Sequence, residues 1–485
     1  MKNKILLTLT ALLLVLVMCF SITACFGDNP NTNISSTTNN NGALPNIPEG
    51  EPIDYTQSLL LIDALFKNYS IFKDSIDFNN AMSDANGAKS NAVSDGKNNE
   101  EATLAAIRAY VAATEDMYAT FYDPEELEAL LSENNGDLYG IGVQVIFDYK
   151  EYFMEIVLIM PDSPAQQNLE IGDKVTHIMD DGEKVALADI VAQYKAEYRE
   201  LYPEYTDEEI NNAACYDTFQ YTVSKLKGPE GTYAEFTVVR GDTSYEMRIQ
   251  RAKVKTVSVT CKTSIRDSKV GIVSILQFDL TTPTQFKDCM DSLIKSGCTK
   301  FIFDVRNNPG GDLASVTAVL STLLQKDDVI LSTKDSSGLV EVTKVKVVTN
   351  SGDYATCNVT SGDIAKYSKY EMVVLANENS ASAAELFTAA LRDHDKALIV
   401  GVNTYGKGSV QSIIPLYYYG DQYYGAIKLT TKLYFPPCGE GYDGGIGIAP
   451  DYPVELEGEA AEVHFYKLTE EIDNQLQKAV SLLID

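Results

Sequence analysis

The sequence predicts a multidomain α/β protein, and three observations support this. The chain has 485 residues, more than one simple domain usually holds. Apolar residues recur at helical spacing early in the chain, alternate as in strands further on, and then fall into strands separated by amphipathic helices. We therefore expect an N-terminal helical region (53–136), a small β domain (137–255), an α/β core (256–458) and a C-terminal helix (459–485).

Charge and histidine content narrow the function. The chain carries 39 Lys and Arg against 69 Asp and Glu, a formal net charge of −30. Because phosphate binding needs clustered cations, this balance argues against nucleic acid and anionic lipid as partners. The three histidines, His177, His394 and His464, are widely separated, which argues against a multi-histidine metal centre. We expect no metal and no cofactor.

The N-terminus has the plan of a bacterial export signal. Two lysines precede an apolar run over 5–19, and the segment 22–25 (Ile-Thr-Ala-Cys) is similar to a lipobox, in which Cys25 is lipidated. We expect a lipoprotein signal (1–24), a flexible tether rich in Asn, Ser and Thr (25–52), and a membrane-anchored protein outside the cytoplasm. A signal that is cleaved nearby, or left uncut as an anchor, is the alternative.

Six further cysteines follow Cys25, namely Cys215, Cys261, Cys289, Cys298, Cys357 and Cys438. No two of them form a Cys-x-x-Cys pair, so zinc and redox motifs are not supported. An even count in an exported protein permits disulfides, and Cys289 and Cys298 are expected to be close across a helix and its following loop. Six buried thiols without any bridge are the alternative.

Local patterns predict individual elements. A polar segment rich in Asn, Ser, Asp and Gly (79–99) predicts a loop, and alternation over 140–145 predicts a strand. A proline in the first turn predicts a helix over 283–296, with Thr282 as its cap. A one-sided apolar stripe predicts a closing helix over 469–484.

The segment 377–386 carries the first chemical signal. It reads Asn-Glu-Asn-Ser-Ala-Ser-Ala-Ala-Glu-Leu, follows an apolar strand and opens a helix. A serine at such a junction exposes its side chain, and the unpaired N–H groups and helix dipole behind it favour a developing oxyanion. On its own, however, a serine between strand and helix is more often only an N-cap.

Two glycine-containing loops carry the other signals. Lys407 lies between glycines shortly after an apolar strand, and burial there would favour the neutral amine that a lysine base requires. A solvated loop lysine is the alternative. The turn 306–311 (Arg-Asn-Asn-Pro-Gly-Gly) follows a buried strand, and Gly310 or Gly311 can present an N–H to an anion. No Gly-Lys-Ser or Gly-Lys-Thr follows it, which excludes a P-loop.

The β domain resembles a PDZ domain. A glycine-bearing first strand, a Ser-Pro-Ala turn, a Gly-Asp turn and a Gly-x-x-Gly-Thr hairpin occur in the order of that fold. Such domains add a peptide to a sheet edge and hold its terminal carboxylate with backbone N–H groups. The resemblance assigns substrate binding to Tyr139, Gly140, Ile141 and Gly142. Residues 188–216 are expected to be a helical insertion, and another small β domain with tight turns is the alternative.

The motifs together resemble the carboxyl-terminal processing peptidases, or tail-specific proteases. The matching segments are 306–311, 380–385 (Ser-Ala-Ser-Ala-Ala-Glu), 404–408 (Thr-Tyr-Gly-Lys-Gly), 428–439 and 447–451. This resemblance implies an α/β serine protease core of the crotonase and Clp protease type. Ala384 and Cys438 depart from the family pattern, which usually has serine at both positions.

The resemblance implies a Ser-Lys dyad. Ser382 would be the nucleophile, Lys407, 25 positions later, the general base, and Gln411 the residue that orients the lysine amine. Ser380 is the competing nucleophile, but its spacing does not match the family. His394 is the rival base, and it lies about 18 Å along the helix from Ser382.

The N–H groups of Ala383 and of Gly310 or Gly311 would form the oxyanion hole. The implied function is an extracytoplasmic serine endopeptidase that cleaves proteins near or from their C-terminal tails and needs no cofactor. The PDZ-like domain would select substrates with apolar tails, and the N-terminal lipid would hold the protein at the membrane. A homodimer is the expectation at family level.

Two alternatives belong to other classes of protein. An inactive PDZ-type scaffold at the cell surface is expected to have lost Ser382 or Lys407, and both are present. A crotonase-type enzyme for acyl thioesters would need cationic or adenine-binding features, which the sequence does not show.

Overall fold

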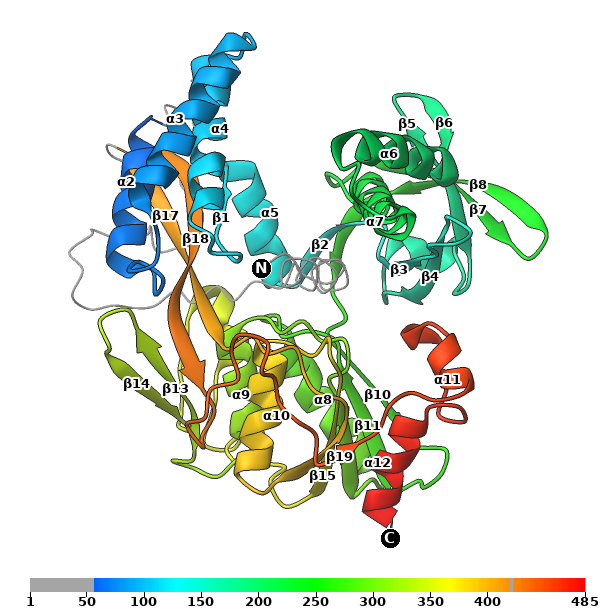
Figure 1. Cartoon of the computed structure of the whole chain (residues 1–485). Helices are drawn as coiled ribbons and strands as arrows, with labels where there is room; N and C mark the ends of the chain where they lie inside the picture. Colours follow the sequence, from blue (N-terminus) through cyan, green and yellow to red (C-terminus); the bar gives the residue numbers. More distant parts are fainter. Residues whose placement is uncertain (1–55, 419–421, 485) are drawn as a thin grey trace. The chain divides into compact units, whose positions relative to one another are not determined.

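Figure 1 shows the chain as a computed structural model that describes residues 56–418 and 422–484. The expected signal peptide (1–24), the lipidated Cys25 and the tether (25–52) lie outside the described residues. None of the helices in the described part combines the length and the apolar character needed to cross a membrane.

The described residues form two compact units, and each is considered by itself. The large unit contains residues 56–135, 258–455 and 474–484. The small unit contains Gly136–Val257 and Leu456–Asp473. The small unit therefore includes part of the C-terminal region, which the sequence alone assigns to a single closing helix.

A six-stranded sheet is the centre of the large unit. In spatial order it contains β10 (Val259–Thr263), β11 (Val270–Ile275), β12 (Lys300–Asp304), β15 (Glu371–Ala376), β16 (Ala397–Gly401) and β19 (Tyr452–Pro453). All neighbours are parallel except the antiparallel edge strand β10. The inner strands are short apolar runs with both faces buried, which is the pattern of parallel strands between layers of helices.

Helices cover both faces of this sheet (Figure 1). One face packs on α8 (Thr282–Lys295), α9 (Leu313–Leu323) and α10 (Ala383–Asp393), with the short η2 (Gly352–Cys357) beside α8 and α9. The other face packs on α12 (Asn474–Ile484). Because α9 and α10 follow β12 and β15, which are parallel neighbours, the turns before both helices meet at the carboxyl ends of the strands. Open α/β sheets bind their ligands at this edge.

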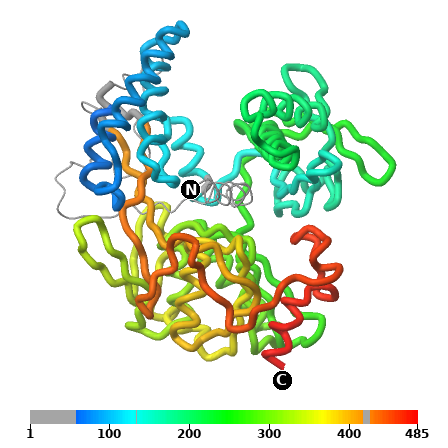
Figure 2. The backbone as a smooth tube through the Cα atoms, viewed as in Figure 1, coloured from blue at the N-terminus to red at the C-terminus, as the bar shows by residue number. Residues whose placement is uncertain are grey.

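A second sheet pairs an early strand of the chain with strands that come much later in the sequence. Its path is β1 (Thr120–Tyr122), β18 (Gln422–Phe435), β13 (Val329–Asp335) and β14 (Val340–Lys344), and β17 (Ser409–Tyr418) also pairs with β18. The helices α2 (Thr56–Tyr69), α3 (Phe78–Ser94) and α4 (Asn99–Ala113) bury an apolar core against β17 and β18, and α5 (Pro124–Asn134) packs on β18. Figure 2 shows these blue helices beside the orange strands. The N-terminal helical region is thus part of the same unit as the α/β core.

The loop expected at 79–99 is wrong, because α3 occupies most of it. The carboxylate of Asp77 accepts the N–H groups of Asn79 and Asn80 and caps the helix. Ala81 and Ala85 are fully buried in the core shared with α4. Capping and tertiary packing stabilise a helix whose polar composition favours a loop.

Three boundaries differ from the expected ones. The helix expected at 283–296 is confirmed as α8, but Thr282 does not cap it, because the Asp279 carboxylate accepts the N–H groups of Thr281 and Thr282 at 2.7 and 3.0 Å. The strand expected at 140–145 is interrupted by a turn between β2 (Asp137–Gly140) and β3 (Val143–Phe147). The closing helix α12 starts at Asn474 rather than at 469.

The small unit is built on a sheet with the order β3, β4 (Met154–Ile159), β5 (Lys174–Asp180), β7 (Tyr233–Arg240) and β8 (Thr243–Gln250). A short strand β6 (Glu183–Ala186) pairs with β5, β2 pairs with β9 (Ala252–Lys255), and a 3₁₀ turn, η1 (Pro164–Gln167), follows β4. Within this sheet β3 pairs with β4 alone. Its other edge is therefore an edge of the sheet, and it follows directly after Ile141 and Gly142.

Two helices and a C-terminal segment complete the small unit. α6 (Leu187–Leu201) and α7 (Asp207–Leu226) cover the range 188–216, where the sequence predicts helix. The segment with α11 (Glu459–Glu462) and η3 (Phe465–Lys467) lies against the sheet, where Lys467 forms an ion pair with Glu155 of β4 at 2.7 Å.

Substituting Gly425 tests the pairing of β1 with β18. Gly425 has a φ of +118°, and an added Cβ would overlap the carbonyl oxygen of Tyr122. Gly425→Ala should therefore lower the free energy of unfolding by about 2–4 kcal/mol in urea melts. Gly96→Ala is the control, because Gly96 also has a positive φ but open space around it. Equal losses in the two variants would contradict the close approach of these strands.

Candidate active site

Ser382 lies in a strained turn between β15 and α10. Its backbone has φ 54° and ψ −117°, and its side chain is nearly fully buried. Such a conformation costs a non-glycine residue about 1–3 kcal/mol and persists only where neighbours enforce it. The enforcing contacts come from both sides, because the Ser382 N–H donates to Glu385 at 2.9 Å and a Cβ on Gly310 would come within 2.7 Å of the Ser382 Cβ.

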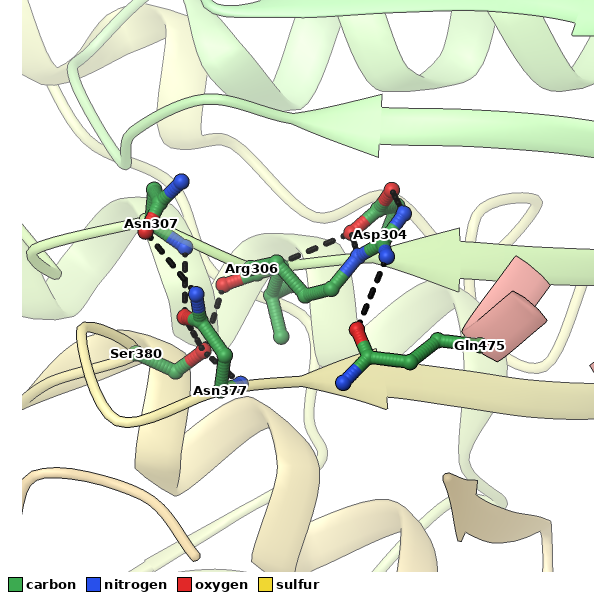
Figure 3. Close-up of polar contacts among 7 residues, drawn as sticks. Asp304, Arg306, Asn307, Asn377, Ser380 and Gln475 are labelled. Atoms are coloured by element: carbon green, nitrogen blue, oxygen red, sulfur yellow. Dashed lines mark hydrogen bonds and ion pairs between the residues drawn. The ribbon is translucent and has the colours of Figure 1, made fainter. Parts of the chain in front are cut away.

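A polar network joins the turn before Ser382 to the turn after β12 (Figure 3). The Asn307 N–H donates to the Asn377 side-chain oxygen at 2.8 Å, and the Asn377 amide returns a bond to the Asn307 side-chain oxygen at 2.9 Å. The Ser380 hydroxyl donates to the Val305 carbonyl at 2.7 Å and accepts the Asn377 N–H at 2.9 Å. Ser380, the competing nucleophile, thus has its hydroxyl engaged within this network.

The Arg306 side chain fixes the turn after β12, which belongs to this network. Its guanidinium makes two bonds to the Asp304 carboxylate, at 3.0 and 2.7 Å, and a third to the Gln475 side chain of α12 at 2.9 Å (Figure 3). The guanidinium is almost completely buried, so a bidentate carboxylate partner is required to offset its desolvation. The ion pair fixes the start of the 306–311 turn.

The backbone N–H groups near Ser382 differ in their availability. The Gly310 N–H donates to the Asn308 side chain at 2.8 Å and is therefore occupied. Within residues 56–418 and 422–484, the N–H groups of Ala383 and Gly311 have no hydrogen-bond acceptor. Ala383 is the first residue of α10, so its N–H points along the helix axis where partial positive charge collects.

The Glu385 carboxylate connects the Ser382 turn to the loop that carries Lys407. Besides the Ser382 N–H, it accepts the Thr404 hydroxyl and the Gly406 N–H at 2.6 Å each and the Lys407 N–H at 2.8 Å. Glu385 is fully buried, which raises the pKa of its carboxyl to about 7 although all four donors favour the ionised form. One side chain thus positions the backbones of both residues of the expected dyad.

Two tyrosines border Lys407. Its Nζ lies 4.4 Å from the ring centroid of Tyr118, an arrangement that stabilises a positive charge on the amine. The Tyr434 hydroxyl donates to the Lys407 carbonyl at 2.6 Å and also neighbours the Ser382 hydroxyl. Burial raises the pKa of Tyr434 well above its usual range, so this phenol stays neutral. Glu385 therefore holds the Lys407 backbone near the Ser382 turn, while the Lys407 amine lies over the ring of Tyr118.

Gln411 is buried on β17. Its amide nitrogen donates to the Ser409 and Thr430 hydroxyls at 3.1 and 3.3 Å. Thr430 in turn donates through its N–H and its hydroxyl to the Asp116 carboxylate at 3.0 and 2.9 Å, and Asp116 also accepts the Tyr118 N–H at 3.1 Å. Gln411 and Tyr118 therefore belong to one network.

The histidines are occupied elsewhere. His394 caps the far end of α10, where its imidazole bonds to the Val329 carbonyl at 2.7 Å. His177 and His464 belong to the small unit. Among the described residues, no three His, Cys, Asp or Glu side chains are grouped so as to hold a metal ion.

The sequence reasoning gave no role to Glu385, Tyr434, Tyr118 or Asp116. A signal existed for Glu385, because Ser382-Ala-Ala-Glu385 has the spacing of a capping box and predicts a carboxylate that reaches back to the serine N–H. No comparable local signal exists for Tyr118 or Asp116, which reach the site through the pairing of β1 with β18. The expected substrate-binding residues Tyr139, Gly140, Ile141 and Gly142 lie in the small unit.

Comparison with known proteins shows what the core is similar to. Residues 269–454 match the model of Peptidase family S41. A probable CtpA-like serine protease of Staphylococcus haemolyticus is 28% identical over 349 residues, which cover 72% of this chain and 59% of that protein. A carboxy-terminal-processing protease of Bartonella bacilliformis is 27% identical over 347 residues, covering 70% of this chain and 67% of that protein. The chain thus spans about three-fifths to two-thirds of the length of these relatives.

Two solved structures match most of the chain at low sequence identity. The photosystem II D1 C-terminal processing protease is 21% identical with a TM-score of 0.45, and the match covers 83% of this chain and 94% of that one. A putative S41 protease from Bacteroides fragilis is 15% identical with a TM-score of 0.48, and the match covers 90% of this chain and 98% of that one.

The raised pKa of Glu385 predicts a pH dependence of stability. Its folded pKa of about 7 exceeds the ordinary value of 4.5, so the folded state binds this proton more tightly than the unfolded state. The corresponding stabilisation is complete below about pH 4.5 and is lost as the pH rises to about 7, by on the order of 3 kcal/mol. Glu385→Gln should remove this dependence.

Urea unfolding at several pH values between 4.5 and 8 measures the effect. The difference in unfolding free energy between wild type and Glu385→Gln should change across this window and level off above it. A constant difference would contradict the assignment. Asp312→Asn can be compared with wild type in the same way as an independent case, because burial also raises the pKa of the Asp312 carboxyl to about 7.

Proposed function

We propose that this protein is a serine endopeptidase with a dyad of Ser382 and Lys407, a proposal supported by the match of residues 269–454 to the model of peptidase family S41. The observation that carries the proposal is the shared Glu385 carboxylate, which binds the N–H groups of both residues. A serine in a strained turn at a helix N-terminus, next to N–H groups without acceptors, suits acyl transfer.

The proposed reaction follows the logic of a base-activated serine. The neutral Lys407 amine takes the proton of the Ser382 hydroxyl while the Ser382 oxygen attacks the peptide carbonyl carbon. The oxyanion that forms accepts hydrogen bonds from the N–H groups of Ala383 and Gly311. The lysine then protonates the leaving amine, and water, activated by the same lysine, hydrolyses the acyl-enzyme.

The placement of Lys407 on the Tyr118 ring bears on this scheme. A base must be neutral, whereas the ring favours the ammonium form, so the amine has to leave the ring before it can deprotonate Ser382. Gln411 suits the role of guiding it, because its amide nitrogen is bound to the Ser409 and Thr430 hydroxyls and an amide oxygen can accept a hydrogen bond from the lysine amine.

We further propose that the small unit is a PDZ-like domain that binds the substrate C-terminus. The open edge of β3 can pair with an extended peptide. Gly142, just before this strand, has an N–H group without an acceptor in the described part of the chain, and this N–H suits a terminal carboxylate. Gly142 has a φ of +81°, and a Cβ there would overlap Ser163, so only glycine fits this turn.

The location of the protein is proposed from its N-terminal sequence. Export, lipidation at Cys25 and anchoring at the outer face of a bacterial membrane follow from the signal-like segment 1–25. Substrates would be proteins with apolar C-terminal tails, and assembly into a homodimer is proposed from the family resemblance.

The dyad is tested by cleavage of an unstructured protein with an apolar C-terminal tail. Ser382→Ala and Lys407→Ala should each lower kcat by about 10³-fold or more, because each removes a group that acts in the transition state. Ser412→Ala and Lys428→Ala are matched controls from the neighbouring sheet and should retain activity. Turnover at the wild-type rate in both dyad variants would refute the dyad.

A wild-type protein that binds the tail without cleaving it would favour the scaffold alternative. Binding of a fluorescent tail peptide, measured for wild type and Ser382→Ala, separates this case from a failure to recognise the substrate.

Recognition of the C-terminus is tested on the substrate. Replacing the terminal carboxylate by an amide should raise KM about tenfold or more, because the Gly142 N–H loses its charged acceptor. As a control, the rate at which the protein hydrolyses a short peptide ester should be the same whether a tail added to the assay ends in a carboxylate or in an amide. Identical KM values for the acid and amide substrates would contradict carboxylate binding by the small unit.

A further inference from the structure

Two cysteines face each other where α8 packs on the edge strand β10. The Gln285 side-chain oxygen of α8 accepts the N–H groups of Ser258 and Val259 at 3.0 and 3.2 Å and sets the alignment of helix and strand. Cys289 lies one helical turn after Gln285 and Cys261 lies two residues after Val259. A turn of helix and two residues of strand each advance about 6–7 Å along the same face. Cys289 therefore meets Cys261.

The next contact along the same line confirms this alignment. Thr263, two residues after Cys261, has its hydroxyl 3.8 Å from the Cys298 thiol just beyond the end of α8. The Cys298 thiol is buried and also lies 3.6 Å from the Ser268 carbonyl. The expected neighbour of Cys289 was Cys298, but the structure places the Cys261 thiol next to it.

The two thiols differ in accessibility. Cys261 is exposed, because β10 is an edge strand, whereas Cys289 is partly buried against the core beneath α8. Burial and the neighbouring Cys261 thiol raise the pKa of Cys289 above its usual range. An oxidant from solution therefore meets Cys261 first. Cys438 is also exposed, so the alternative of six buried thiols is wrong.

We propose that Cys261 and Cys289 are a site of disulfide formation that staples the edge strand β10 to α8. The oxidant is a low-molecular-weight disulfide. The Cys261 thiolate attacks one of its sulfurs and releases the first thiol as a leaving group. The Cys289 sulfur then attacks the Cys261 sulfur of this mixed disulfide and releases the second thiol. Two protein thiols lose two electrons and two protons, which reduce the oxidant to two thiols.

The bond would stabilise one edge of the sheet. Among the described strands of this sheet, β10 pairs only with β11, and it also packs on α8. The bridge would close a loop of 28 positions between Cys261 and Cys289. A disulfide that closes a loop of this length stabilises the folded protein mainly because it reduces the conformational freedom of the unfolded chain. This proposal is independent of the peptidase activity.

Peptide mapping of the full-length chain tests the proposal. The reduced protein is incubated with oxidised glutathione, its remaining thiols are blocked with N-ethylmaleimide, and it is digested and analysed by mass spectrometry without reduction. The expected product is a peptide pair joined through Cys261 and Cys289. Its formation should raise Tm by about 5 °C, reversibly on reduction.

Cysteine variants distinguish the outcomes. Cys261→Ser and Cys289→Ser should each abolish the linked peptide and the rise in Tm, whereas Cys438→Ser, at the other cysteine exposed within residues 56–418 and 422–484, should leave both unchanged. A link between Cys289 and Cys298, or a stable glutathione adduct on Cys261 without the bridge, would overturn the proposal. Absence of any linked peptide in a protein that remains folded by circular dichroism would overturn it as well.

Discussion

The buried Glu385 carboxylate is the interaction on which the candidate site depends. It accepts four donors from two separate loops, and these include the N–H groups of Ser382 and Lys407. The two loops are also joined directly, because the Tyr405 N–H donates to the Ser380 carbonyl at 3.0 Å, so this backbone bond and the Glu385 side chain together set the distance between them. A carboxylate suits this task, because it has only acceptors and charge-assisted bonds to it are strong. The cost is desolvation of a charge in the interior.

The parallel sheet explains why the serine can be strained. β12 and β15 end side by side, so the turns 306–311 and 377–382 are joined by amide side chains and by the Ser380 hydroxyl, and a buried Arg306–Asp304 pair holds the start of the first turn. This network holds the Ser382 backbone at a positive φ that an isolated turn would not adopt. As at any helix N-terminus, the first N–H of α10 has no partner within the helix, and it directly follows the strained Ser382.

Local patterns predicted much of the fold, and long-range pairing accounts for most of the rest. The helix predicted over 283–296 is found as α8 within a residue of its predicted ends, because the proline in its first turn marks the start of the helix. The polar composition of 79–99 led to the wrong prediction of a loop. Capping by Asp77 and the packing of small alanines outweigh the low helix propensity of this segment. At the site, motifs singled out Ser382 and Lys407. Tyr118 and Asp116 were missed because strand pairing across the chain, rather than any local pattern, brings them to Lys407 and Thr430.

The pairing of β1 with β18 has a consequence for how the chain acquires its structure. Asp116 and Thr430 are hydrogen-bonded although 314 positions separate them. The N-terminal helices emerge first during synthesis, yet the apolar face that packs on β17 and β18 stays uncovered until those strands follow. High contact order of this kind slows folding and prolongs the lifetime of intermediates that are prone to aggregation. Helper proteins that hold the unfinished chain are therefore expected to matter for its yield, and a truncated chain without β18 should aggregate rather than form a smaller active protein.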